Sequence, residues 1–372
     1  MVEWKKLGDI CEIKGRIGFR GYTRDDQVDK GKGAISLSPG NIDNGSMNYE
    51  SCTYITWEKY NESPEIIVNE GDIILCKTAS VGKVARIHHL PEKATINPQL
   101  VLIKNIQTNP QYLFYVLDDK PFQSIIKGLA GIGSVPNVSQ AKLSAIEIPI
   151  PSLYDQTRIV GILDTFTASI DNLKEQIAQR RKQYEYYRDQ LLDLEGKEGV
   201  EMKTLGEICD NLDYMRKPIT SSKRKTGIYP YYGASGIVDY VEGYIFDGEY
   251  LLVSEDGANL VARNYPIAFS VKGKNWVNNH AHVLAFESKI TQKFVEIYLN
   301  MIDLSPWING AAQPKLNQAN LNTIDIPIPS LSEQQRIVSI LDTFEASIRN
   351  LEAQLSQREK QYEYYRNKLL TF

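Results

Sequence analysis

Residues of the types that most often build catalytic and metal sites are scarce in this sequence. The 372 residues include four histidines and four cysteines, Cys11, Cys52, Cys76 and Cys209. The cysteines lie far apart and form no Cys-x-x-Cys pair, which argues against a structural zinc site and fits a reducing compartment. No apolar run reaches the roughly 18 residues of a membrane span, and the first residues lack the apolar segment of a signal peptide. We therefore expect a cytoplasmic protein without membrane contact.

A surplus of basic residues is also missing. Lys and Arg number 42 against 46 Asp and Glu, which leaves a net charge of −4. By segment, the net charge is 0 over residues 1–147, −2 over 148–199, −2 over 200–325 and 0 over 326–372. Because phosphate attraction supplies most non-specific nucleic-acid affinity, this balance disfavours a chain that binds DNA tightly by itself.

Catalytic motifs are present only as fragments. Residues 109–112 (Asn-Pro-Gln-Tyr) lack the second proline of the Asn-Pro-Pro-Tyr motif of amino-methyltransferases. Glu287-Ser288-Lys289 could end a nuclease motif, but no paired acidic residue precedes it. His280 and His282 have the spacing of a metal-binding His-x-His pair, although two polar residues on one face of a strand are the commoner interpretation. These gaps disfavour an enzyme.

The dominant feature of the sequence is a tandem repeat. Residues 148–192 and 326–370 align without a gap at an offset of 178 and are identical at 32 of 45 positions. Residues 2–11 and 200–209 are identical at 7 of 10 positions, at an offset of 198. The stretches between these matches differ, which is the pattern of a constant scaffold that carries two recognition surfaces. Neutral divergence of loops is the alternative.

The repeated segment predicts a long helix. Large or apolar residues recur in alternating steps of four and three from Ile159 to Leu191 and again from Ile337 to Leu369, which is a heptad seam. Ser152 and Ser330 each begin a capping box. The helix from Ser152 to Leu194 would be about 60 Å long. If the second domain has adjacent termini, the second helix runs back along the first as an antiparallel coiled coil. A homodimeric coiled coil is the alternative.

The variable segments predict mixed, strand-rich domains. Residues 71–89 and 248–270 contain β-branched runs broken by Gly, Asn and Asp, while 110–119 and 292–303 have the pattern of short helices. The expected fold class is α+β, with two globular domains and a pseudo-two-fold repeat. The expected boundaries are 1–147 for the first domain, 148–199 for the first helix, 200–325 for the second domain and 326–372 for the second helix.

In this order, the motifs resemble the specificity subunit of type I restriction-modification systems. The resemblance rests on IPIPSL, Q-x-R-I-V-x-I-L-D and K-Q-Y-E-Y-Y-R in both helical segments, and on K-x-L-G-x-I-C at the start of each repeat. The first domain adds GDIILCKTASVGKVA, and the second adds YPYYGASG (residues 229–236) and NNHAHVL (residues 278–284). The likeness covers essentially the full chain.

The resemblance implies a DNA-recognition subunit without catalysis or bound cofactor of its own. Each domain would recognise one half of a bipartite, asymmetric site in double-stranded DNA, and the coiled coil would set the spacer. Two modification subunits would dock on the helices and bring S-adenosylmethionine and the adenine methyltransferase site. Two restriction subunits would add ATP-driven translocation and Mg-dependent cleavage. With a near-neutral chain, we expect tight DNA binding only in the assembled complex.

Candidate DNA contacts are forked, cationic or amide side chains on loops that can enter a groove. In the first domain they are Arg16, Arg20, Arg24, Lys77, Ser80, Lys83, Asn137 and Gln140. In the second domain they are Arg216, Lys223, Arg224, Lys225, Lys272, Lys274, Asn275, Trp276 and Asn278. For each of these a solvated surface role is the alternative.

The candidates for partner docking are residues that repeat away from the seam, namely Arg158 with Arg336 and Lys182 with Lys360. Two further functions remain open at this point. One is a two-headed coiled-coil adaptor for protein or glycan partners, and the other is a self-sufficient nuclease or methyltransferase.

Overall fold

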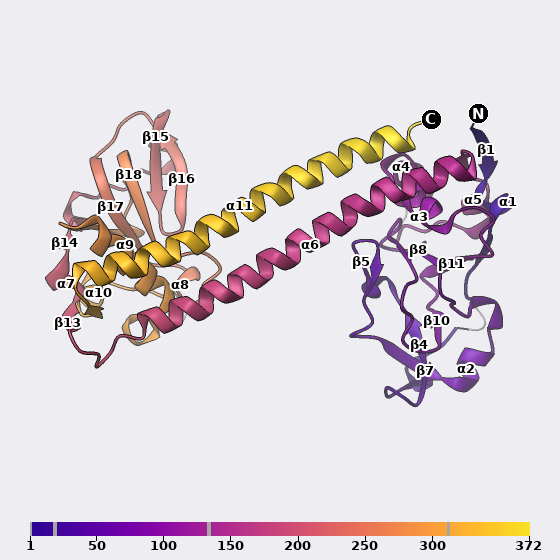
Figure 1. Ribbon diagram of the computed structural model, residues 1–372, viewed down its shortest axis with the longest axis horizontal. Helices are drawn as coiled ribbons and strands as arrows, with labels where there is room; N and C mark the ends of the chain where they lie inside the picture. Colours follow the sequence, from indigo (N-terminus) through magenta and orange to yellow (C-terminus); the bar gives the residue numbers. More distant parts are fainter. Residues whose placement is uncertain (1, 18–20, 132–134, 311–312) are drawn as a thin grey trace. The chain divides into compact units, whose positions relative to one another are not determined.

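The chain forms two compact units in the computed structural model, which describes residues 2–17, 21–131, 135–310 and 313–372. The first unit comprises Met1–Leu173 with Gln354–Phe372, and the second comprises Lys174–Ala353. Each unit contains one strand-rich domain and one segment of each long helix, α6 (Leu153–Leu192) and α11 (Leu331–Leu370) (Figure 1). The expected α+β class and the two repeated domains are confirmed.

Both long helices begin at the serines that the sequence predicts. The Asp155 N–H donates to Ser152 Oγ at 3.1 Å, and the Glu333 N–H donates to Ser330 Oγ at 3.4 Å. These bonds satisfy backbone donors that the first helical turn leaves without a partner. The first helix ends at Leu192, two residues earlier than predicted, and Gly196 follows with a positive φ of 72°.

A buried glutamine attaches the start of each helix to its domain. Gln156 is 1% exposed; its amide donates to the Pro151 carbonyl at 2.9 Å and accepts from Thr108 Oγ1 at 2.5 Å. Gln334 repeats this arrangement, with the Pro329 carbonyl and Thr291 Oγ1 both at 2.8 Å. The glutamine of the repeated Q-x-R motif is therefore a structural residue.

The two helices pair in antiparallel fashion inside each unit. In the first unit Phe166 stacks on Tyr365, with ring centroids 5.3 Å apart and an interplanar angle of 27°. In the second unit Phe344 stacks on Tyr187 with the same distance and angle. Both partners are shifted by 178 residues between the two pairs, so the contact obeys the internal repeat. The prediction of an intramolecular antiparallel coiled coil is confirmed within each unit.

A four-stranded sheet with a flanking helix forms the framework of each domain. In the first domain the strand order is β2 (Glu12–Lys14), β11 (Leu100–Lys104), β8 (Ile73–Cys76), β9 (Val84–Arg86), and α3 (Pro110–Asp118) contributes buried residues to the same core. The second domain has the matching order β14 (Asp210–Asn211), β19 (Ala281–Ala285), β17 (Phe246–Ser254), β18 (Ala268–Val277), with α9 (Lys289–Met301). The two predicted short helices are confirmed.

A short antiparallel ladder closes each domain just before its long helix. It pairs β1 (Glu3–Lys6) with β12 (Glu147–Ile150) in the first domain, and β13 (Glu201–Thr204) with β20 (Asp325–Ile328) in the second. The expected boundaries at 147/148 and 325/326 therefore fall inside strands, because the Ile-Pro-Ile-Pro segments belong to these ladders.

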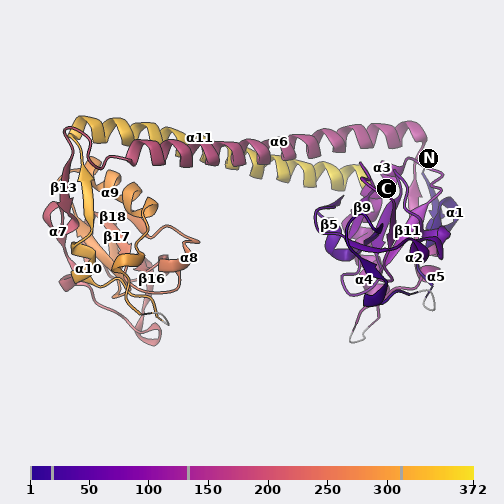
Figure 2. The same ribbon diagram turned by 90° about the horizontal axis from the view of Figure 1, so that it is seen from below.

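The domains differ in what is added to the framework. The first carries a second sheet in the order β10 (Ala94–Ile96), β4 (Gly33–Leu37), β7 (Thr53–Thr56), β3 (Gln27–Val28), and a small ladder of β5 (Ile42–Asp43) with β6 (Ser46–Met47). In the second domain β15 (Thr226–Gly233) and β16 (Gly236–Val241) extend the sheet instead, and β16 lies on the side away from the helices (Figure 2). The remaining helices are α1 (Leu7–Ile10), α2 (Trp57–Asn61), α4 (Lys120–Leu129), α5 (Gln140–Ser144), α7 (Leu205–Ile208), α8 (Asn259–Ala262) and α10 (Gln318–Asn322).

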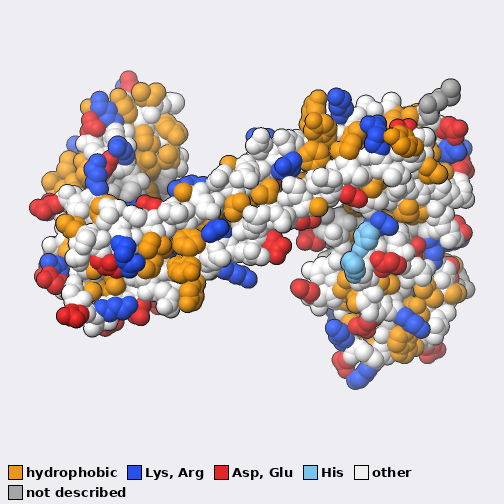
Figure 3. All heavy atoms as spheres, viewed as in Figure 1, with side chains coloured by type: hydrophobic (Ala, Val, Ile, Leu, Met, Phe, Trp, Pro, Cys, Tyr) orange, Lys and Arg blue, Asp and Glu red, His pale blue; other side chains and the backbone are white. Residues whose placement is uncertain are grey.

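The surface carries both signs of charge side by side. On the face that Figure 3 shows, Lys and Arg side chains are interspersed with Asp and Glu over both units. Among the described residues, no helix combines the length and the apolar character that crossing a bilayer requires.

Candidate nucleic-acid interface

The loop between β8 and β9 is the first candidate surface of the first domain. It turns at Ala79, whose φ of +62° is left-handed, and the Gly82 N–H returns to the Cys76 carbonyl at 3.0 Å. The side chains of Ser80 and Lys83 are exposed, while Lys77 is half-buried. The fixed backbone therefore presents a short polar edge that can approach a groove.

A second predicted stretch meets this loop. The Val138 N–H donates to the Lys77 carbonyl and the Ala79 N–H donates to the Pro136 carbonyl, both at 2.9 Å. Thr78 Oγ1 donates to the exposed Asn137 side chain at 2.7 Å. The structure thus brings Lys77, Ser80, Lys83 and Asn137 to one edge, although the sequence separates them by up to 60 positions.

Two other candidates of the first domain are structural residues, which corrects the prediction. Arg16 is 4% exposed, and its guanidinium donates to the Ile96 carbonyl at 3.2 Å and to Thr95 Oγ1 at 3.1 Å. The Gln140 amide faces the Ile13 carbonyl and the Gly15 N–H, each at 3.2 Å. Both side chains form their hydrogen bonds inside the domain and are therefore not available to a DNA base. Arg24 is exposed, and Arg20 lies outside the described residues.

The second domain has an equivalent loop that the sequence reasoning missed. The Leu316 N–H donates to the Glu255 carbonyl at 2.8 Å, and the Gly257 N–H donates to the Pro314 carbonyl at 3.1 Å. Each of these residues lies 178 positions after its counterpart in the first domain, and Gly257 repeats the positive φ of Ala79 with a value of 106°. At this offset residues 73–82 and 251–260 have no identical position and share only the apolar run that precedes the loop, Ile73–Leu75 and Leu251–Val253.

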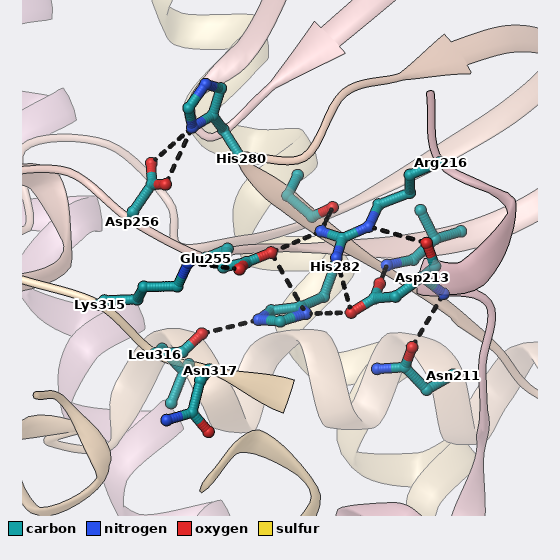
Figure 4. Close-up of polar contacts among 12 residues, drawn as sticks. Asn211, Asp213, Arg216, Glu255, Asp256, His280, His282, Lys315, Leu316 and Asn317 are labelled. Carbon is teal, nitrogen blue, oxygen red and sulfur yellow. Dashed lines mark hydrogen bonds and ion pairs between the residues drawn. The ribbon is translucent and has the colours of Figure 1, made fainter. Parts of the chain in front are cut away.

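A buried charged network supports this second loop and includes a predicted DNA contact. Arg216 pairs with Asp213 at 3.2 Å and with Glu255 at 2.6 Å, and it donates to the Ala281 carbonyl at 2.8 Å (Figure 4). Lys315 pairs with the other oxygen of Glu255 at 3.0 Å. Arg216 is consequently a structural residue and not a side chain free to contact DNA, because two carboxylates hold its guanidinium inside the domain.

His282 completes the network. The ring is fully buried, with Nδ1 2.5 Å from Asp213 Oδ2 and Nε2 2.7 Å from the Leu316 carbonyl. Both ring nitrogens therefore have an oxygen partner inside the domain. His280 lies outside the network, where it is half exposed and bonded to Asp256. The two histidines therefore have separate partners and do not form a His-x-His metal pair.

The network sets the pKa of its carboxyl groups. Burial by itself would raise the pKa of Asp213 and of Glu255. Hydrogen bonds and positive charge from His282 at Asp213, and from Arg216 and Lys315 at Glu255, outweigh burial and hold the pKa of each carboxyl below its ordinary value. Both groups are thus stabilised as anions.

The same residues offer the donor types of a metal site. Ligand atoms of Asp213, Glu255 and His282 lie within 4.8 Å of one another. Arg216 already pairs with both carboxylates, so a cation would have to displace its guanidinium. The residues fit an ion-pair network better than a metal site.

The basic run of the second domain splits into bound and exposed side chains. Arg224 donates to the Ile219 carbonyl at 3.0 Å, pairs with Asp239 at 3.2 Å and lies over the Tyr231 ring at 4.6 Å. Lys223 is exposed, and Lys225 is 83% exposed with Glu242 3.8 Å away. The two lysines stay predicted DNA contacts, whereas Arg224 chiefly anchors its loop.

Strand β18 contains four of the remaining candidates. Asn275 is fully buried and donates to the Gly273 carbonyl at 2.8 Å, so it is not a surface contact. Trp276 Nε1 donates to the Lys217 carbonyl at 2.6 Å, which fixes the half-buried indole. Lys272 pairs with Glu249 at 2.6 Å, and Lys274 lies over the Tyr244 ring at 4.7 Å. Only these two lysines remain accessible, and both already have partners.

The equivalent loop of the second domain borders a cleft of about 650 Å³. Its lining includes Asp256 and Gly257 from that loop, Arg224, and two residues that follow β18, namely Asn278 and His280. Asn278 is 6% exposed, and its Oδ1 accepts from the His280 N–H at 2.8 Å. Of the candidates in the second domain, Arg224 and Asn278 therefore lie at the cleft, and the cleft itself adds Asp256 and His280.

The match to a family model decides where this architecture belongs. The model of the type I restriction modification DNA specificity domain matches residues 1–180 and again residues 197–359. The chain belongs to this family. Each matched segment contains one domain and the larger, first part of the long helix that follows it. The two specificity domains therefore coincide with the internal repeat.

Two relatives bear specificity-subunit names. A type I restriction enzyme specificity subunit of Haemophilus influenzae is 45% identical over 185 residues, which are 48% of this chain and 47% of the relative. The specificity subunit of a type I restriction enzyme of Escherichia coli is 32% identical over 296 residues, 70% of each chain. The match thus spans about half the length of the first relative and 70% of the second.

Solved structures share the fold. The S subunit of a type I restriction-modification system from Mycoplasma genitalium aligns with a TM-score of 0.64 over 100% of this chain and 96% of its own, at 16% identity. A chain from a structure on complex assembly and conformational transition of the type I system aligns with a TM-score of 0.61 over 99% and 97%. At such low identity, the likeness concerns the fold alone.

Proposed function

We propose that this chain is the DNA-recognition subunit of a type I restriction-modification complex and that each domain recognises one half of a bipartite site. The proposal rests on the two equivalent loops, which lie at the same place on the framework that both domains share. Residues 77–79 with 136–138 and residues 255–257 with 314–316 occupy equivalent positions but differ in their side chains. One scaffold with two different edges suits an asymmetric site.

The chain in this proposal recognises DNA and has no catalytic role of its own. Modification and restriction subunits carry methyl transfer and ATP-driven cleavage, and they bring S-adenosylmethionine, ATP and Mg. Two copies of each would bind, because the helix surface offers each docking position twice. Support comes from Arg158 and Arg336, which are 56% and 53% exposed at repeat-related positions, and from the exposed Lys182 and Lys360.

Methylome sequencing of the host with and without this gene tests the proposal. The wild-type host should contain a bipartite methylated motif that the deletion strain lacks. Exchange of residues 1–147 for the corresponding domain of another family member should change one half of the motif and leave the other half and the spacer intact. If no bipartite motif disappears in the deletion strain, the chain is better explained as a two-headed adaptor for proteins or glycans.

A further inference from the structure

The equivalent loops of the two domains differ in chemistry at one matched position. In the first domain, position 78 is a threonine whose hydroxyl donates to Asn137, and the exposed cation Lys83 follows in the same loop. In the second domain the equivalent position is Asp256, with a side chain 31% exposed at the edge of the cleft. A carboxylate thus occupies the place where the first domain has a neutral hydroxyl.

The Asp256 carboxylate is held in place from one side. His280 Nδ1 lies 2.9 Å from both oxygens of Asp256 (Figure 4). The His280 backbone is fixed in turn by Asn278 Oδ1 at 2.8 Å, and the neighbouring Glu255 is locked into the buried network. One ring nitrogen cannot saturate two carboxylate oxygens, so acceptor capacity remains on Asp256.

The cleft also contains a donor. Asn278 is 94% buried and lines the cleft, and its side-chain amide has N–H donors beside the Oδ1 that accepts from the His280 N–H. A carboxylate acceptor and an amide donor therefore line one concave surface. This combination suits a polar heterocycle edge better than a phosphate, because phosphate oxygens would repel Asp256.

We propose that Asp256, oriented by His280, is a specificity-determining residue that accepts a hydrogen bond from an exocyclic amino group of a base in the half-site of the second domain. The amino group is N4 of cytosine or N6 of adenine, the major-groove donors for which a carboxylate is the matching acceptor. The inference rests on the proposed function and adds that the matched positions 78 and 256 contribute different chemistry, a hydroxyl in the first domain and a carboxylate in the second.

The test uses the complex of this chain with its methyltransferase subunits. It measures binding of this complex to unmethylated duplexes that contain the motif identified by methylome sequencing. At each adenine or cytosine of the half-site, one duplex carries the analogue without the amino group, purine or 2-pyrimidinone. With the wild-type chain, one analogue should weaken binding about tenfold or more. With Asp256→Ala, which removes the acceptor, the same analogue should cause little further loss. A purine effect identifies adenine, and a 2-pyrimidinone effect identifies cytosine.

Two variants control for structural effects. Asp247→Ala makes the same chemical change at an exposed position of β17 that does not line the cleft, and it should retain the wild-type analogue effect. His280→Gln should reduce the analogue effect in part, since it loosens the carboxylate. Thermal unfolding of each variant verifies that the domain is folded.

The outcomes separate the inference from the function. Equal analogue effects in wild type and Asp256→Ala at every adenine and cytosine would overturn the role of Asp256. Absence of any bipartite methylated motif with the wild-type chain would instead contradict the proposed function.

Discussion

At the residue scale, charged side chains of the second domain divide into those that are buried beneath the equivalent loop and those that are accessible at the surface. Arg216, Glu255 and Asp213 are buried together, with side chains 13%, 11% and 5% exposed. Asp256 and Lys225 are 31% and 83% exposed. Substitutions in the first group should act on stability, and those in the second on recognition.

Arg216→Met should lower the free energy of unfolding by about 3–5 kcal/mol, because it removes the guanidinium that pairs with both buried carboxylates. Lys225→Met should change it by less than about 0.5 kcal/mol, since its side chain is exposed. Denaturant unfolding measures both. If the Arg216→Met chain unfolds with wild-type stability but no longer recognises its DNA site, Arg216 is a base contact and not a structural residue.

The same network makes the stability depend on pH. The pKa of Asp213 and of Glu255 is lower in the folded chain than in the unfolded chain, so both groups contribute stability above the unfolded values of about 4. That contribution should be lost as the pH falls further, through the lower pKa values of the folded state. Thermal unfolding between pH 2 and 7 should show a steeper acid loss for the wild type than for Asp213→Asn, which is less stable at pH 7. If stability falls equally steeply with pH in the wild type and in Asp213→Asn, the buried network is not the cause of the acid loss.

At the element scale, the paired long helices are the component that relates the two recognition domains in the proposed function. Each helix has 40 residues, and the Phe166–Tyr365 and Phe344–Tyr187 stacks show that the seam keeps one register in both repeats. A whole heptad adds about 10 Å and leaves the seam facing its partner.

Insertion of one heptad after Gln176 together with one after Gln354, its repeat equivalent, should lengthen the unspecified spacer of the motif by about three base pairs, at 3.4 Å per base pair. Both half-sites should stay the same. Methylome sequencing provides the readout. As a matched control, a four-residue insertion after Gln176 alone shifts one seam against the other and should abolish methylation. An unchanged spacer with the double insertion would contradict the ruler role.

At the scale of the whole molecule, the near-neutral charge determines how the chain can bind DNA. The net charge is −4, and on the face in Figure 3 the two signs are mixed. Few counterions would be released from the phosphates by such a surface, so in the proposed function affinity would come from the partner subunits and specificity from a few side chains.

Fluorescence anisotropy with a labelled duplex should therefore give a dissociation constant of about 1 µM or weaker for the chain alone, with a shallow dependence on salt between 50 and 200 mM. The complex with the modification subunits should bind in the nanomolar range and lose affinity steeply with salt. Tight, salt-sensitive binding by the isolated chain would show that this chain contacts the DNA phosphates strongly without its partner subunits.

The sequence alone determined the repeat, the long helices with their serine caps and seam, and the short helices of each domain. These features depend on residues only a few positions apart, whose periodicity and capping act locally. The α+β class and the antiparallel coil followed from the same patterns together with the order of the segments.

Only the tertiary structure decided which polar residues are free to meet DNA. Arg16 donates a hydrogen bond to Thr95, 79 positions away, and Arg216 donates to Glu255, 39 positions away. The loop that contains Lys77 is bonded to residues about 60 positions later in the chain. Whether a side chain is buried and bonded depends on such distant contacts, and no local pattern encodes them. For that reason Asp256 became a candidate only when the structure showed that it occupies the position equivalent to Thr78 of the first domain.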